Sequence, residues 1–131
     1  MKYLLLVFLL LATSLMAKPP FLSQGYIPHY TKKIAKNWDN DFLDLTAEQK
    51  TKLIKVRKDT MKAIGNLKTK LQPLEQELAD KVVSGVPPKQ LRNLVKQIAK
   101  YKEAATMVHL RCVSNTQKIL TKEQLDLLPS L

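Results

Sequence analysis

A histidine and a cysteine stand three residues apart at His109 and Cys112, and His29 is the other histidine of the chain. Imidazole and thiolate groups bind zinc, but a protein site normally supplies three or four such ligands. A metal site would therefore require His29 or acidic residues to converge on this pair, so the three residues are weak metal candidates. No further side chain is evident that would orient His109 as a base for Cys112. We predict no enzyme activity and no cofactor.

Cys112 is the single cysteine, which excludes a disulfide within the chain. It falls in the apolar pattern of a predicted helix, where a cysteine is most often a small buried hydrophobe. A disulfide between two copies is the alternative, because an odd cysteine in an oxidising compartment invites pairing.

The composition predicts one small, basic and helical domain. The chain has 131 residues, three of them glycine, and 22 Lys and Arg against 11 Asp and Glu, a net charge of +11. It is too short for a (β/α)₈ barrel, which needs about 200 residues or more. The three glycines form no phosphate-binding loop. Large enzyme folds and nucleotide-dependent enzymes are therefore excluded.

The first 17 residues have the pattern of a secretory signal peptide. Lys2 precedes an apolar run over residues 3–12, and small residues lead to Ala17. The run is shorter than the roughly 20 residues of a membrane span. We predict export to the periplasm with cleavage after about Ala17; an uncleaved anchor is the alternative. Export argues against nucleic acid as the partner of this basic chain and favours anionic lipids, acidic proteins or unfolded polypeptides.

Two long helices are predicted after a mostly irregular arm over residues 18–44, in which Ile34 and Trp38 permit one docked helical turn. The first helix covers residues 46–84, and Pro73 is expected to bend it. Its apolar stripe is Ile54, Met61, Ile64, Leu67, Leu71, Leu74, Leu78 and Val82. The second covers residues 88–120, and its seam is Leu91, Leu94, Ile98, Tyr101, Ala105, Val108, Cys112 and Ile119. A short helix follows over residues 122–128.

Glycine and prolines between the two long helices, at residues 84–88, predict a reversal. The fold class is therefore all-α: a long antiparallel helical hairpin with short flanking helices. Two helices bury only one stripe each, and a small domain buries little surface. We expect a homodimer to cover the exposed stripes.

A pentapeptide occurs twice, as residues 45–49 before the first long helix and as residues 120–124 after the second. With Thr46 or Thr121 as the N-cap, Gln49 or Gln124 falls at the third helical position and completes a capping box. The plain interpretation is two well-formed helix starts.

Two such L-T-x-E-Q boxes around a basic hairpin, behind a signal peptide, resemble the Spy/CpxP family with its LTxxQ motif. The motif corresponds here to Leu45, Thr46, Gln49, Leu120, Thr121 and Gln124. The resemblance covers residues 45–131, the predicted helical domain. It implies a cradle-shaped periplasmic homodimer that acts as an ATP-independent chaperone for unfolded or misfolded envelope proteins. Alternatively it implies a negative regulator of an envelope-stress sensor kinase, or a metal-sensing or metal-buffering protein.

Basic residues at helical spacing form two ribbons, one on each long helix. The plain interpretation is a solvated face. The functional interpretation is a client-binding surface, on which lysines attract acidic segments and flexible apolar side chains add contacts. The candidate client-binding residues are Lys55, Lys58 and Lys62 on the first helix and Arg92, Lys96, Lys100, Met107, Leu110 and Arg111 on the second.

Arg57 is set apart because it falls within the predicted apolar stripe, three residues after Ile54. A buried arginine is rare unless it is paired. We expect it to reach solvent or to pair with a carboxylate across an interface. A contact with clients is the functional alternative, so Arg57 joins the candidate client-binding residues.

Overall fold

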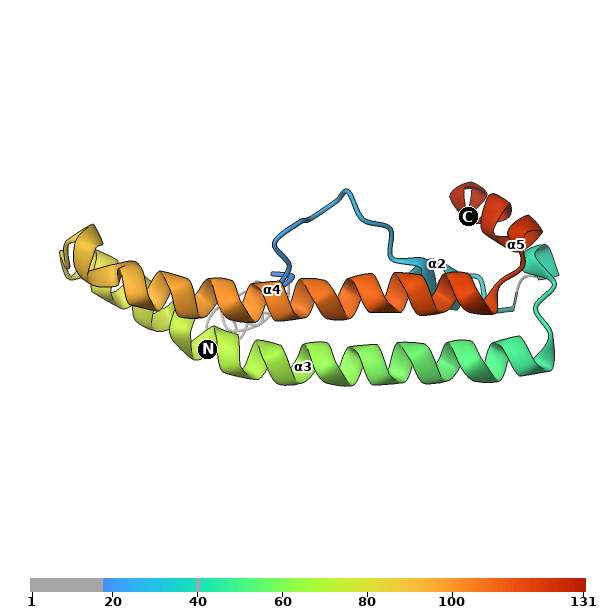
Figure 1. Cartoon of the computed structure of the whole chain (residues 1–131), viewed down its shortest axis with the longest axis horizontal. Helices are drawn as coiled ribbons and strands as arrows, with labels where there is room; N and C mark the ends of the chain where they lie inside the picture. The colour runs from blue at the N-terminus through green and yellow to red at the C-terminus, as the bar shows by residue number, and fades with distance from the viewer. Residues whose placement is uncertain (1–17, 40) are drawn as a thin grey trace, which may run out of the picture.

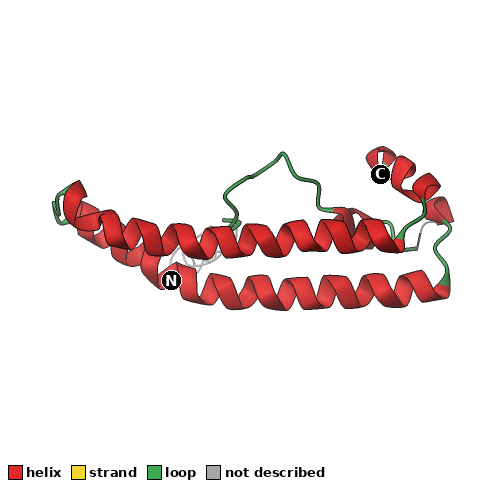
Figure 2. Cartoon of the chain, viewed as in Figure 1, coloured by secondary structure: helices red, strands yellow, loops and turns green. Residues whose placement is uncertain are grey.

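The computed structural model describes residues 18–39 and 41–131. Its two long helices, α3 (Ala47–Val83) and α4 (Pro88–Ile119), run antiparallel and pack against each other (Figure 1). Short helices lie before and after them: α2 (Tyr30–Lys36), the 3-10 helix η1 (Asp41–Leu43), α5 (Lys122–Leu127) and the 3-10 helix η2 (Leu128–Ser130). The described residues contain no strand, as Figure 2 shows. The predicted all-α class and the packed pair of long helices are confirmed.

The turn between α3 and α4 is closed by the backbone. Gly85 has a φ of 82°, and its N–H donates to the Val82 carbonyl at 3.1 Å. The Val86 N–H donates to the Lys81 carbonyl at 3.0 Å. This pair of bonds is the Schellman motif, which needs a left-handed residue and favours glycine. Pro87 and Pro88 then start α4, where a missing N–H costs nothing.

Pro73 lies inside α3, as expected. Figure 1 shows that α3 changes direction where its colour turns from green to yellow, the part that contains this proline. A proline inside a helix removes one backbone hydrogen bond and crowds the preceding turn, which bends the helix.

The predicted apolar stripe of α3 is wrong at Ile54 and Met61, whereas its members Ile64 and Leu71 are buried as predicted. Leu53 is buried, whereas Ile54 and Met61 are 55% and 58% exposed. At about 100° per residue, Leu53, Ile64 and Leu71 lie within about 20° of one direction, while Ile54 and Met61 lie about 80 to 100° away. Spacings of three, four and seven fit the face that contains Leu53 as well as the face that contains Ile54. The face that contains Leu53 is the buried one because α2 and α4 pack against it. Val82, near the turn, is also exposed.

The seam of α4 agrees better with its prediction. Five of its members are buried, namely Leu91, Leu94, Ile98, Ala105 and Cys112, and Tyr101, Val108 and Ile119 are half-buried. The seam also buries His109 and Thr116, which the apolar pattern does not indicate. The Thr116 hydroxyl donates a hydrogen bond to the Cys112 carbonyl one turn earlier, at 2.8 Å.

The larger hydrophobic cluster lies where α3 begins and α4 ends. It joins α2, η1, α3, η2 and the residue that caps the end of α4, and it consists of Ile34, Leu43, Leu53, Leu120 and Leu128. Ile34 and Leu43 belong to the arm that the sequence analysis set apart as residues 18–44, so the packing continues across that boundary. A second, smaller cluster of Leu71, Leu94 and Ile98 lies toward the turn.

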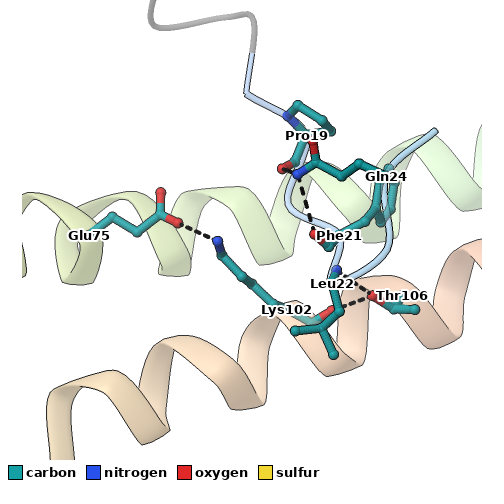
Figure 3. A network of polar contacts seen from close by, with 7 residues as sticks. All are labelled: Pro19, Phe21, Leu22, Gln24, Glu75, Lys102 and Thr106. Carbon is teal, nitrogen blue, oxygen red and sulfur yellow. Dashed lines mark hydrogen bonds and ion pairs between the residues drawn. The ribbon is translucent and has the colours of Figure 1, made fainter. Parts of the chain in front are cut away.

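The first described residues of the arm pack on the middle of the hairpin (Figure 3). The Leu22 N–H donates to Thr106 Oγ1 at 2.9 Å, and that hydroxyl donates to the Lys102 carbonyl at 2.8 Å. The Lys102 side chain reaches Glu75 at 3.3 Å and so joins α4 to α3. The arm is therefore held on the hairpin at Leu22 and then bends over α4 before α2 begins (Figure 1).

Candidate functional site

Both repeated pentapeptides form capping boxes. The Thr46 hydroxyl accepts from the Gln49 N–H at 3.1 Å, and the Thr46 N–H donates to Gln49 Oε1 at 3.0 Å. The same two bonds join Thr121 and Gln124, at 3.2 and 2.9 Å. Each box satisfies two N–H groups that a helix start leaves without partners.

The two boxes also meet each other, which sequence reasoning missed. Gln49 Nε2 donates to Gln124 Oε1 at 2.8 Å and to the Ile119 carbonyl at 3.1 Å. Gln124 Nε2 donates to Gln49 Oε1 at 3.1 Å and to the Leu43 carbonyl at 2.9 Å. We call this the glutamine clamp, made of Gln49 and Gln124. It joins the starts of α3 and α5 to the end of α4 and to η1. The glutamine of each repeat therefore has two roles: it caps its own helix and it bonds the other box.

The two basic ribbons are exposed, but the structure does not bring them together. Lys58 and Lys62 lie about 140° and 180° around α3 from buried Leu53. Lys96 and Met107 lie about 160° and 180° around α4 from buried Ile98. Because the buried faces of α3 and α4 meet, the ribbons lie on opposite outer faces of the hairpin.

Most charges of the ribbons have no ion-pair partner in the described part of the chain. Lys55 is the exception, because its Nζ lies 2.7 Å from Asp59 Oδ2. The hydrogen bond from Lys55 holds the pKa of the Asp59 carboxyl below its ordinary value. The residues without an ion pair there are Lys58, Lys62, Arg92, Lys96, Lys100 and Arg111. On α4, Met107 and Leu110 are exposed among these cations, as predicted.

A pocket of about 190 Å³ lies between α2 and the first half of α3. Its walls are mainly apolar, and Arg57 is one of the residues that line it. The lining residues are Thr31, Ile34, Ala35, Trp38, Leu53, Ile54 and Arg57. Lys50 Nζ lies 5.9 Å from the centre of the Trp38 ring, within reach of a cation–π contact.

Arg57 lies half-buried in this pocket and makes no ion pair with the described residues. Sequence reasoning singled out Arg57 but placed no pocket beside it. The signal available was the pair Ile34 and Trp38 in the arm, whose spacing predicted a docked helical turn without showing where it docks.

The structure brings His29 and His109 together but builds no ligand set around them. Their rings stack with centroids 4.0 Å apart and planes 10° apart, and Phe21 lies against both. Nitrogen lone pairs point outward in the plane of an imidazole, so stacked parallel rings do not aim them at one ion. Cys112 Sγ lies 3.7 Å from Thr31 Oγ1 instead. Among residues 18–39 and 41–131, no three His, Cys, Asp or Glu residues group as metal ligands.

His109 fixes the position of the arm. It is 4% exposed, and its Nε2 lies 3.1 Å from the Pro28 carbonyl. Because a carbonyl only accepts, Nε2 carries the hydrogen in this contact. Its Nδ1 is buried without a hydrogen-bond partner among the described residues. Partial desolvation lowers the pKa of His29, and the neighbouring His109 and Lys32 lower it further. Protonation of His29 is therefore disfavoured while the arm is attached.

Comparison of the chain with protein-family models, curated proteins and solved structures gives no match. No helix in the described ranges is long and apolar enough to cross a membrane. The predicted signal peptide, residues 1–17, lies outside the described residues. The fold and the site therefore define a class only: a small, basic helical hairpin with exposed cationic faces and an apolar pocket.

Proposed function

We propose that this protein is a periplasmic, ATP-independent chaperone that binds unfolded or misfolded envelope proteins. The observation that carries the proposal is the surface of the hairpin. Two outer faces carry cations without acidic partners in the described chain, and large apolar side chains are exposed beside them. The resemblance of the two capping boxes to the Spy/CpxP motif supports the same function.

Capture would proceed by attraction followed by weak contact. A net charge of +11 draws acidic segments from a distance. Exposed Met107 and Leu110 on α4, like Met61 on α3, then contact apolar segments through flexible side chains that adapt to many partners. Each contact is small, so a client is shielded from aggregation and still released. No nucleotide is needed for such a cycle.

We also propose a homodimer with the cradle shape that the resemblance implies. Exposed Val82 on α3 and Val95 on α4 leave apolar surface in the half of the hairpin nearer the turn for a second copy to cover. Sedimentation at micromolar concentration tests this. A dimer supports the proposal, and a stable, purely monomeric species would contradict it.

Suppression of aggregation tests the chaperone function. A denatured acidic test protein is diluted into buffer without ATP, and its light scattering is followed with and without the chain. Protection is expected, and it should weaken from 0.1 to 1 M salt as the Debye length falls from about 10 to about 3 Å. The combined variant R92Q, K96Q, K100Q and R111Q should capture more slowly and respond less to salt. A chain that gives no protection at low salt would contradict the proposal.

The same assay separates the alternatives. His109→Ala and a chelator should both leave protection intact if the basic faces carry it. Loss of protection on chelation alone would favour a metal-sensing or metal-buffering protein. A pull-down from envelope extract that yields one sensor kinase rather than many clients would favour the regulatory alternative.

A further inference from the structure

The pocket between α2 and α3 combines an apolar interior with one cation. Helix α2 buries Ile34 in the larger cluster, and Ala35 and Trp38 line the pocket across from Ile54 on α3. More than half of the surface of Ile54 reaches solvent, so the pocket is open from outside. A polypeptide segment can therefore reach it without opening the fold.

The volume limits what the pocket can hold. An engineered apolar cavity of about 150 Å³ binds a benzene molecule. A pocket of about 190 Å³ is thus suited to one aromatic or branched aliphatic side chain. The rest of an extended segment would lie outside, over α3.

The charge of the pocket selects what stands beside that side chain. Arg57 has no carboxylate partner within the described chain, and Lys50 adds a second cation at Trp38. A guanidinium next to apolar walls is less screened than one in open water, so a carboxylate that reaches it forms a stronger pair than at an exposed site. An aspartate or glutamate next to the inserted side chain supplies that carboxylate.

We propose that this pocket is a specific subsite for client segments in which an apolar residue is flanked by acidic residues. The apolar side chain enters between Trp38 and Ile54, and a flanking carboxylate pairs with Arg57. The inference rests on the proposed function and deepens it, because it gives the chaperone a preferred sequence in place of charge attraction alone.

Trp38 gives a direct readout, since it is the single tryptophan of the chain. The full chain is titrated with an acetylated, amidated peptide Gly-Ser-Asp-Leu-Asp-Ser-Gly, and tryptophan emission is followed at fixed ionic strength. A saturable change in emission is expected. One comparison peptide replaces both aspartates with lysine, and another replaces the leucine with serine. Both should bind at least about tenfold more weakly, because each loses one of the two interactions.

Variants test the assignment of Arg57. Arg57→Gln removes the cation and should weaken binding of the aspartate peptide about tenfold. The affinity of this variant for the lysine peptide should not fall. Arg57→Lys keeps a charge and should lose less. Lys70→Gln is the matched control: it removes one exposed cation from α3 at a site that does not line the pocket, and it should bind as the parent does. Thermal melts confirm that each variant is folded.

The outcomes separate the subsite from the function on which it rests. If the parent chain suppresses aggregation but Trp38 emission does not respond to the aspartate peptide, the subsite is wrong and the basic faces alone bind clients. Equal binding of the lysine peptide, or parental binding by Arg57→Gln, also overturns it. If Trp38 emission changes with protein concentration in the absence of peptide, a second copy of the chain occupies the pocket and the client subsite is wrong. If the parent gives no protection at all, the proposed function itself fails.

Discussion

The two ends of the hairpin are built differently. At the end where α3 begins and α4 ends, α2, η1, α5 and η2 surround the larger cluster, and the glutamine clamp joins the starts of α3 and α5 to the end of α4 and to η1. At the turn, two helices face each other with a thin stripe between them, and Val83 is 88% exposed. The first end has enough elements to enclose a core, whereas the second depends on backbone closure by the Schellman motif. Stability should therefore be concentrated at the first end.

Core truncation should reveal the largest difference between the ends. Leu128 is 1% exposed in the larger cluster, and Leu128→Ala should lower the free energy of unfolding by about 2–5 kcal/mol, through lost burial and the cavity left behind. Val83→Ala at the turn should change it by less than about 0.5 kcal/mol. Urea unfolding of both variants checks the contrast. Similar losses at both positions would show that stability is not concentrated at the first end.

The glutamine clamp should give the next largest effect. Gln124→Ala leaves the Leu43 carbonyl without its partner and removes the two bonds between the Gln124 and Gln49 amides, so it should cost about 1–3 kcal/mol. Because Gln49 and Gln124 bond each other, Gln49→Ala combined with Gln124→Ala should cost less than the sum of the single variants. Urea unfolding of the complete cycle measures this coupling. Strict additivity would mean that the two side chains act only as separate caps.

Loss of a single cap hydroxyl should cost less. Thr46→Ala and Thr121→Ala should each lower the free energy of unfolding by about 0.5–2 kcal/mol, without removing any client contact. Thr69→Ala is the matched control in the half nearer the turn, since Thr69 is exposed inside α3 and bonds only the Gly65 carbonyl there. It should be close to neutral. If both cap variants unfold at the same temperature as the parent chain but no longer protect clients, the boxes recognise clients and the capping account is wrong.

Acidification should loosen the arm and give the smallest effect. The folded-state pKa of His29 lies below its ordinary value of 6.5, so the unfolded chain binds the proton more tightly. The stability of the attached arm is thus complete above about pH 6.5 and falls as the pH drops below it. Hydrogen exchange of residues 19–36 at pH 7.5 and 5.5 measures this. His29→Gln should reduce this pH response. If exchange in the arm changes with pH only as it does in an unstructured peptide, the account is wrong.

The long helices could be predicted from sequence because their signals are local. A capping box, a C-terminal glycine and an apolar period placed the ends of α3 and α4 within one or two residues. The face of α3 was harder. Ile54 and Leu53 are neighbours, and the choice between their rows depends on α2, which packs on α3 from a distant part of the sequence.

The contacts of the arm could not be predicted for the same reason. The stack of His29 on His109 and the pocket beside Arg57 both join segments that are far apart in the sequence. The clamp is instructive, because the repeat itself was visible. Its two glutamines were assigned to their own helix starts, and only the fold shows that one amide serves both its own cap and the other box.

The central claim is that the outer faces of α3 and α4 bind unfolded acidic polypeptides. Met61 and Met107 are the two methionines of the described chain, exposed on α3 and α4 respectively. Their methyl groups can be labelled with ¹³C, assigned through Met61→Leu and Met107→Leu, and followed by NMR while reduced, carboxymethylated α-lactalbumin is added. We predict that both resonances shift or broaden at 0.1 M salt and recover in large part at 1 M. Methyl resonances that stay unchanged at saturating client would contradict the account.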